Sequence, residues 1–266
     1  MTVVLCGIGC DTTNAGRVAP IYEDGRFEYV PIPEKTHETE ETATHGTWSL
    51  RHDEGVAADL LSAITPDPSE GTTVRGEALR EWPLHHDPNF EALAYGEHRP
   101  NYVRRLRGLE PGDVVGFYAG LRPPGGGRAH RYLIGYTSVN CVDVIPPGTS
   151  REEAGELFDA HPENAHAKRA RTGGRFYDEE TVVLVDGREP GGLFERDPVQ
   201  MSVYEVKPDN ERPQYYLDPA FAERFAVTEG RDNMQFKPAY LCDLDGGAFV
   251  EDVGAESTGR QNLLIE

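Results

Sequence analysis

Histidine and aspartate lie two residues apart in the segment His85-His86-Asp87, which precedes Pro88. In an extended segment, side chains two positions apart point to the same side, so His85 and Asp87 could act together. Such a pair can ligate a metal ion, or it can form a general base with the carboxylate that orients it. The alternative is that Asp87 begins a turn while the histidines pack or face water. This segment is the first candidate site.

A second polar cluster runs from Asn164 to Arg169 and includes His166 and Lys168. On a helix, His166 and Arg169 lie three residues apart and share one face, so the basic groups could converge on a phosphate. The alternative is a solvated helix whose cations pair with nearby acids. If His166 also meets His85, two imidazoles and a carboxylate would suit zinc or another transition metal.

The basic residues are unevenly distributed. Eight of the 26 fall in two short stretches, namely Arg99, Arg104, Arg105 and Arg107, and Lys168, Arg169, Arg171 and Arg175. In so acidic a chain, this clustering predicts a local anion site, which we expect Arg104, Arg105, Lys168 and Arg169 to border. Aromatic residues of the neighbouring strands could stack on a base, with packing in the core as the alternative.

The overall charge indicates the solvent in which the protein works. The chain has 46 acidic and 26 basic side chains, a net charge of −20, and its basic residues are 22 arginines and four lysines. Abundant acids with few lysines favour a halophilic cytoplasm, since the Debye length is only about 3 Å at 1 M salt. The acidity therefore does not exclude an anionic partner, although it argues against stable duplex binding.

Several classes of protein are excluded by the absence of their patterns. No apolar run reaches the roughly 18 residues of a membrane helix, and the N-terminus lacks a secretion signal, so we expect a cytoplasmic protein. The cysteines do not have zinc-ribbon spacing, which favours buried, reduced thiols at Cys6, Cys10, Cys141 and Cys242. The glycine-rich stretch at residues 123–130 matches no phosphate-binding loop, and the common hydrolase and kinase motifs are absent.

Strands and helices alternate along the chain in a way that could position both clusters. Strands are expected over residues 2–9, 110–121, 130–145 and 180–187, and helices over 53–64, 152–160 and 220–227, with further helical turns after Pro100 and Pro162. Asp11 and Asn14 fall in the turn after the first strand, and Asp24 falls in a hairpin turn. We expect residues 1–266 to form one mixed α+β domain with a central sheet, a barrel-like sheet being one option, and peripheral helices.

Several ordered segments resemble one family. They are GIGCDTTNAGRVAPIYEDGRFEYVPIPE, LHHDPNFEALAYGEHRP, EPGDVVGFYAGLRP, RYLIGYTSV, NAHAKR and PGGLFERDPVQMS. Together they are similar to the third of the nucleotide-modification-associated domain families, which is assigned to DNA base hypermodification, and the resemblance is strongest over residues 1–202. It implies a role in modifying nucleic-acid bases or nucleotides, or in acting next to that modification. Its matching polar positions are Asp11, Asn14, Asp24, His85, Asp87, Asn164, His166 and Arg169.

We therefore predict two groups of site residues. The catalytic candidates are His85, Asp87, His166 and Asp11, and the candidates for binding a nucleotide or phosphate are Asn14, Asn164, Lys168, Arg169, Arg104 and Arg105. The pattern names no reaction, metal, cofactor or oligomeric state. The alternative is a non-catalytic module that binds RNA or modified bases, because GDVVGFYAG followed by YLIGY also resembles PUA-like domains. The enzyme hypothesis requires the Asp11 turn, the His85 loop and the His166 helix to meet in one pocket.

Overall fold

A mixed β-sheet forms the centre of the computed structural model, which describes residues 1–173, 177, 179–208 and 210–259. The main path of neighbouring strands is β12 (Val227–Glu229), β13 (Tyr240–Cys242), β1 (Val3–Gly7), β6 (Val114–Arg122), β7 (His130–Ile145), β8 (Val182–Leu193) and β5 (Ala94–Glu97). Two short strands join it, β2 (Ala19–Pro20) on β6 and β9 (Val199–Gln200) on β7. The predicted mixed α/β class is confirmed. The end strands β12 and β5 do not pair with each other in the described chain, so the sheet is open and the barrel-like option is not realised.

The first strand lies inside the sheet and is covered on both faces. It runs parallel to β6 and antiparallel to β13, and all of its residues are buried. Leu5 packs with α6 (Pro219–Arg224) and α7 (Gly246–Gly259), whereas Cys6 packs in the cluster that contains α3 (Pro100–Leu106). Because successive side chains of a strand point to opposite faces, a continuous apolar run is what a strand covered on both sides requires.

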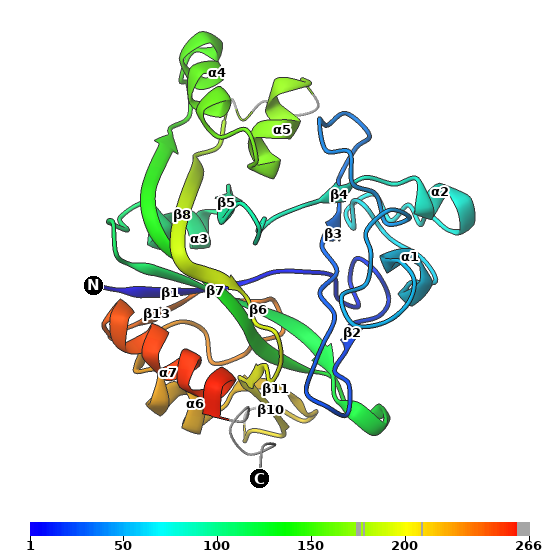
Figure 1. Cartoon of the computed structure of the whole chain (residues 1–266), viewed down its shortest axis with the longest axis vertical. Coiled ribbons are helices and arrows are strands. Elements are labelled where there is room, and N and C mark those ends of the chain that lie inside the picture. Colours follow the sequence, from blue (N-terminus) through cyan, green and yellow to red (C-terminus); the bar gives the residue numbers. More distant parts are fainter. Residues whose placement is uncertain (174–176, 178, 209, 260–266) are drawn as a thin grey trace.

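The predicted central strand pair is confirmed as β6 and β7, which pair antiparallel from Val114 opposite Ser138 to Leu121 opposite His130. β7 also pairs with β8, from Gly135 opposite Leu193 to Ile145 opposite Val182. Two helices, α4 (Arg151–Ala160) and α5 (Ala165–Arg171), pack at the far end of these two strands (Figure 1). The polar cluster from Asn164 to Arg169, which α5 and the residue before it contain, therefore lies at one end of the sheet.

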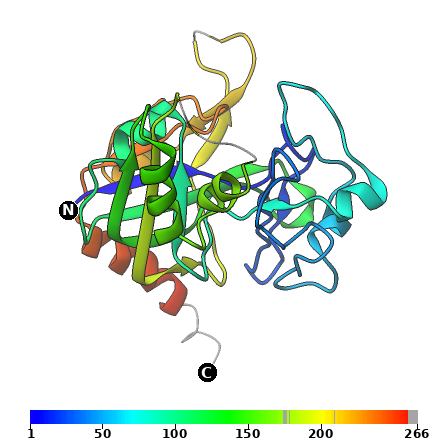
Figure 2. The same cartoon turned by 90° about the horizontal axis from the view of Figure 1, so that it is seen from above.

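Residues 30–90 form a loop-rich lobe beside the sheet, which Figure 2 shows from above. The lobe contains β3 (Ile32–Pro33), α1 (Ala57–Leu60), α2 (Gly76–Arg80) and β4 (Leu84–His85). In the short pair of β3 with β4, Ile32 lies opposite His85. The backbone of His85 is therefore fixed by strand pairing, although most of the lobe has no regular structure.

The prediction of a helix over residues 53–64 was wrong in its extent. Only the single turn α1 forms, because Leu61 is extended and Ile64 pairs with Val74 in an isolated β-bridge. The Asp59 carboxylate accepts a hydrogen bond from the backbone N–H of Val56, which caps the short turn. Tertiary pairing has thus overridden the local helical pattern.

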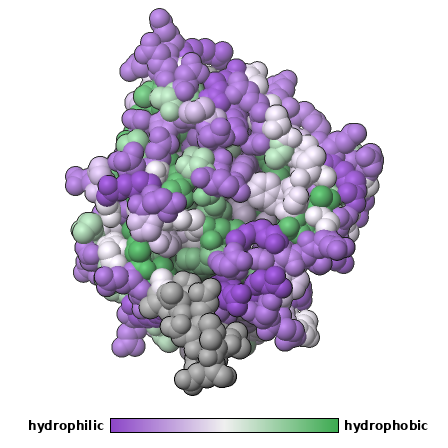
Figure 3. Space-filling model, in the orientation of Figure 1, coloured by the Kyte–Doolittle hydropathy of each residue, from purple (hydrophilic) through white to green (hydrophobic). Residues whose placement is uncertain are grey.

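The face in Figure 3 is mostly hydrophilic, with smaller apolar areas near its middle. Among the large apolar side chains that are exposed, Phe236 stands out, with 84% of its surface accessible. In the described part of the chain, no helix has the length and apolar character needed to cross a membrane.

Candidate functional site

His85, Asp87 and His166 meet at the wall of one cavity of about 400 Å³. One ligand atom from each residue can be chosen so that all three lie within 4.8 Å of one another. Oδ2 of Asp87 is 3.7 Å from Nε2 of His85 and 3.5 Å from Nε2 of His166. Both imidazoles therefore face the same carboxylate oxygen, and we call these three residues the His-Asp-His centre.

The extended backbone from β4 orients the first two members of this centre. His85 and Asp87 point to the cavity, while the intervening His86 points away and packs edge-on against Trp48, with a centroid distance of 4.7 Å. This is the alternation expected of an extended segment. Asp87 is fixed further, because its Oδ1 accepts a 2.9 Å hydrogen bond from the backbone N–H of Gly96 in β5.

Asn164 positions the third member by beginning α5. Its side-chain oxygen accepts hydrogen bonds from the backbone N–H groups of His166 and Ala167, at 2.9 and 3.4 Å, as an N-cap. Gly96 allows β5 to approach this turn, since a Cβ there would overlap the imidazole of His166. Asn164 is thus a buried capping residue that does not line the cavity.

A buried set of polar residues holds both imidazoles from behind. Nδ1 of His85 lies 2.9 Å from Oε2 of Glu34, and Nδ1 of His166 lies 2.7 Å from the hydroxyl of Tyr177. Arg169 joins the two, because it forms an ion pair with Glu34 and donates a 3.2 Å hydrogen bond to Tyr177. The same Nδ1 of His85 also lies 3.1 Å from Nη2 of Arg169, so it contacts both a carboxylate and a guanidinium, while Nε2 of the ring faces Asp87.

Burial controls the charge of the centre. It lowers the pKa of His166 well below the ordinary value, so this imidazole is neutral and can act as a ligand. Burial also raises the pKa of Asp87 well above its usual range, and the hydrogen bond from Gly96 offsets only part of this. At Glu34, burial opposes ionisation, but His85 and Arg169 outweigh it and hold the pKa below its ordinary value. Burial outweighs the nearby charges of Arg99 and Arg169 at Asp87, in contrast to Glu34.

The turn after β1 reaches the same cavity from the other side. Asn14 and Lys237 line the wall, together with Gly9 of that turn. Asp11 does not line it: its carboxylate accepts a 2.7 Å hydrogen bond from the N–H of Thr13 and lies 3.1 Å from Nζ of Lys237. Asp11 thus fixes the turn and the lysine from behind. Asp24 lies elsewhere, in an exposed turn where it bonds Arg26.

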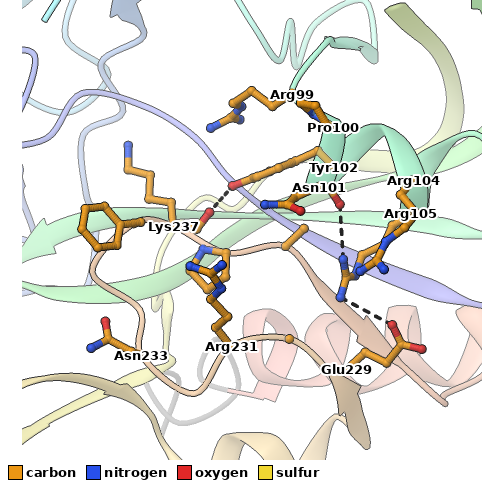
Figure 4. Close-up of a pocket in the computed structure, with 14 residues that line it drawn as sticks. Arg99, Pro100, Asn101, Tyr102, Arg104, Arg105, Glu229, Arg231, Asn233 and Lys237 are labelled. Atoms are coloured by element: carbon orange, nitrogen blue, oxygen red, sulfur yellow. Dashed lines mark hydrogen bonds and ion pairs between the residues drawn. The ribbon is translucent and has the colours of Figure 1, made fainter. Parts of the chain in front are cut away.

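The four cations expected to border one anion surface are separated. Arg169 is only 3% exposed and is held by Glu34, and Lys168 pairs with Glu41 and Glu163 at 3.0 and 3.2 Å. Arg104 and Arg105 line a second cavity, which Figure 4 shows. The reason is that the cations of α5 pair with acids of the lobe, namely Glu34, Glu40 and Glu41, whereas α3 lines the second cavity. Arg175, which belonged to the same stretch as Lys168, lies outside the described residues.

Sequence patterns missed four residues around the centre and its cavity, namely Glu34, Gly96, Tyr177 and Lys237. Their partners are distant in sequence: Glu34 meets Arg169, and Lys237 donates 3.1 and 2.7 Å hydrogen bonds to the carbonyls of Ile8 and Gly9. The one available signal was the rarity of lysine, because Lys237 is one of only four in the chain.

Comparison with known proteins gives one family. No curated protein and no solved structure matches the chain. The sequence model of the nucleotide modification associated domain 3 family matches residues 2–252, which include the His-Asp-His centre and both cavities. The chain therefore belongs to the nucleotide modification associated domain 3 family.

Proposed function

We propose that this protein is an enzyme that acts on a nucleotide or nucleobase at the His-Asp-His centre, and that the centre binds a divalent transition metal ion. The family supports a substrate of the nucleotide class. The observation that carries the proposal is the shared focus of two imidazole Nε2 atoms on Oδ2 of Asp87, at the wall of a cavity.

The distances suit a metal ion. With metal–ligand bonds of about 2.0–2.1 Å, two ligands of a tetrahedral zinc ion lie roughly 3.3 Å apart. The separations of 3.5 and 3.7 Å need only small side-chain rotations to reach this value. Glu34 and Tyr177 contact the Nδ1 atoms of the two imidazoles, and such outer contacts usually orient metal-bound histidines.

The charge balance also favours a cation. A divalent ion would stabilise the ionised form of Asp87, which burial otherwise disfavours. Three protein ligands would leave at least one coordination position for water or substrate. A metal at such a position could activate water or polarise a substrate oxygen.

The cavity suits a small polar substrate. Its volume of about 400 Å³ falls in the range of about 300–1,000 Å³ that is typical of small-molecule sites. Ile8, Ile32 and Pro33 supply apolar walls, whereas Lys35 and Arg99 supply cations. A flat base against the apolar wall, with polar contacts at its edge, fits this mixture.

The direct test is to measure nucleotide binding with and without metal. Tag-free protein, either loaded with zinc, manganese or iron(II) or treated with chelator, would be titrated with the common nucleosides and nucleoside monophosphates. We expect metal-dependent binding that His166→Gln abolishes and His86→Gln preserves. His86 is the matched control, because it is a neighbouring buried histidine that faces away from the cavity.

Each other outcome has a definite meaning. In one outcome, wild type binds and converts a nucleotide equally well in chelator, and both properties are lost in His166→Gln. That result would replace metal chemistry by acid–base catalysis. Tight binding of a modified base without any conversion would favour the alternative, a non-catalytic recognition module of PUA-like function. If neither variant changes nucleotide binding, the first cavity is not the binding site.

We also propose that the protein works in a cytoplasm of high salt concentration. The support is its net charge of −20 and its content of 22 arginines against four lysines. The melting temperature should rise with KCl over the molar range, because screening relieves repulsion among the acids. A flat or falling melting temperature in circular-dichroism melts would contradict the halophilic hypothesis without affecting the site.

A further inference from the structure

A second cavity adjoins the first, and the charged side chains that line it are mainly cationic. Its volume is about 620 Å³, and Arg99 and Lys237 line both cavities. Figure 4 shows that α3 supplies Arg104 and Arg105 on one wall, and that the loop after β12 supplies Arg231 and Asn233 on the other. The first and second cavities are thus neighbours that share two cationic residues.

The arginines that line the second cavity are unequally compensated, and Arg99 is the well-paired one, with Glu97 at 2.6 Å. Neither Arg104 nor Arg231 forms an ion pair or a side-chain hydrogen bond within the described part of the chain, and both are exposed. Arg105 is partly compensated, because its Nη1 donates a 3.2 Å hydrogen bond to the carbonyl of Asn101 and its Nη2 lies 3.5 Å from Glu229, but its Nε is buried without a hydrogen-bond partner. In a chain of net charge −20, acids are abundant, so arginines that remain unpaired around one cavity point to an anionic ligand.

The neighbouring groups narrow the class of anion. Arginine binds phosphate through a planar pair of N–H donors, and the amide of Asn233 adds a further donor. Phe236 lines the same cavity and is 84% exposed, which suits a ring that stacks on a base. A phosphate beside a base is the chemistry of a nucleotide.

We infer that the second cavity binds the phosphate-bearing part of a nucleotide whose base enters the first cavity. This inference rests on the proposed function for the placement of the base, but the phosphate site itself does not. Arg104, Arg231 and Arg105 bind the phosphate oxygens, and Arg99 and Lys237 lie at the junction of the two cavities. The phosphates come either from a free nucleoside triphosphate or from the backbone of a single strand, in which case Phe236 stacks on the adjacent base.

Calorimetric titration of the full-length protein with three probes tests the inference. The probes are inorganic tripolyphosphate, the four deoxynucleoside triphosphates and single-stranded decanucleotides of each base. The double variant Arg104→Ala/Arg231→Ala should bind the phosphate probes at least about tenfold more weakly than wild type. The control Arg107→Ala/Arg212→Ala removes the same charge from exposed arginines outside the cavity and should leave the affinities nearly unchanged.

The probes separate the two sources of phosphate and the two proposals. If the double variant loses affinity for triphosphates alone, the ligand is a free nucleotide. If it loses affinity for decanucleotides alone, and Phe236→Ala binds them approximately tenfold more weakly, the ligand is a single strand. Tripolyphosphate needs no base, so binding by His166→Gln and wild type alike upholds the phosphate site even if the proposed centre fails. Equal weakening in the control, or no binding of any phosphate probe by wild type, overturns the inference. Circular dichroism would verify that each variant is folded.

Discussion

The two adjoining cavities differ in how their arginines are held. In the first cavity, Arg169 is 3% exposed and bonds both Glu34 and Tyr177. In the second cavity, Arg104 and Arg231 are exposed and have no ion pair among the described residues. A buried, paired arginine fixes the position of other groups, whereas an exposed, unpaired one is available to a ligand. The difference fits the two proposals, namely a fixed centre for chemistry beside exposed cations that can bind phosphate.

The largest expected effect separates these two kinds of arginine. Arg169→Ala should lower the free energy of unfolding by about 3–5 kcal/mol, because it leaves the Glu34 carboxylate buried without its cation. Arg104→Ala should change the free energy of unfolding by no more than about 0.5 kcal/mol. Urea unfolding followed by circular dichroism measures both. Similar values for the two variants would abolish the distinction between the cavities.

A smaller effect concerns the approach of β5 to the His-Asp-His centre. A Cβ at Gly96 would overlap the imidazole of His166 and lie 2.8 Å from Oδ1 of Asn164. Gly96→Ala should therefore cost about 1–3 kcal/mol of folding stability and weaken metal binding, while leaving tripolyphosphate binding in place. Gly108→Ala is the control, since nothing lies within 4 Å of its Cβ position. Unchanged metal affinity in Gly96→Ala would mean that the centre tolerates displacement of His166.

The smallest expected effect lies outside both cavities, at the end of α4. His161 bonds Asp143 and Asp186, each at 2.8 Å. Burial disfavours its protonation, but the two carboxylates outweigh burial and raise the pKa of His161 above the ordinary value. The contribution of His161 to the free energy of unfolding should thus be complete below the unfolded pKa of about 6.5. It should decline as the pH rises through the pKa of the folded state.

The variant His161→Gln checks this assignment. Urea unfolding at several pH values should show less loss of stability above pH about 6.5 in the variant than in wild type. If both proteins lose stability equally over that range, the pH dependence arises from other groups, such as those around the first cavity.

Local sequence patterns predicted the parts of the molecule that local forces determine. The pairing of β6 with β7 follows from their β-branched and aromatic residues, and the orientation of His85 and Asp87 follows from the period of an extended chain. The expectation that His85 and His166 would meet also agrees with their 4.9 Å centroid distance. The catalytic and binding roles of these residues stay predictions.

The remaining features depend on contacts between distant segments. Neither the partnership of Glu34 with Arg169 nor the placement of Lys237 between the cavities has a signature in the neighbouring sequence. Charge clustering indicated that the arginines matter, but it could not distinguish Arg169, which pairs inside the protein, from Arg104, which does not. Folding decides that distinction by placing an acid beside only one of them.

The most direct test of the His-Asp-His centre is titration of tag-free, metal-free protein with Co²⁺, followed by visible absorption. Cobalt reports its ligands through absorption bands whose intensity rises when the coordination is tetrahedral or five-coordinate. The account predicts saturation at one Co²⁺ per chain in wild type and in His86→Gln, and no such bands in Asp87→Asn or His166→Gln. Bands that persist in Asp87→Asn and His166→Gln, or that are absent from wild type, would contradict a metal centre at these three residues.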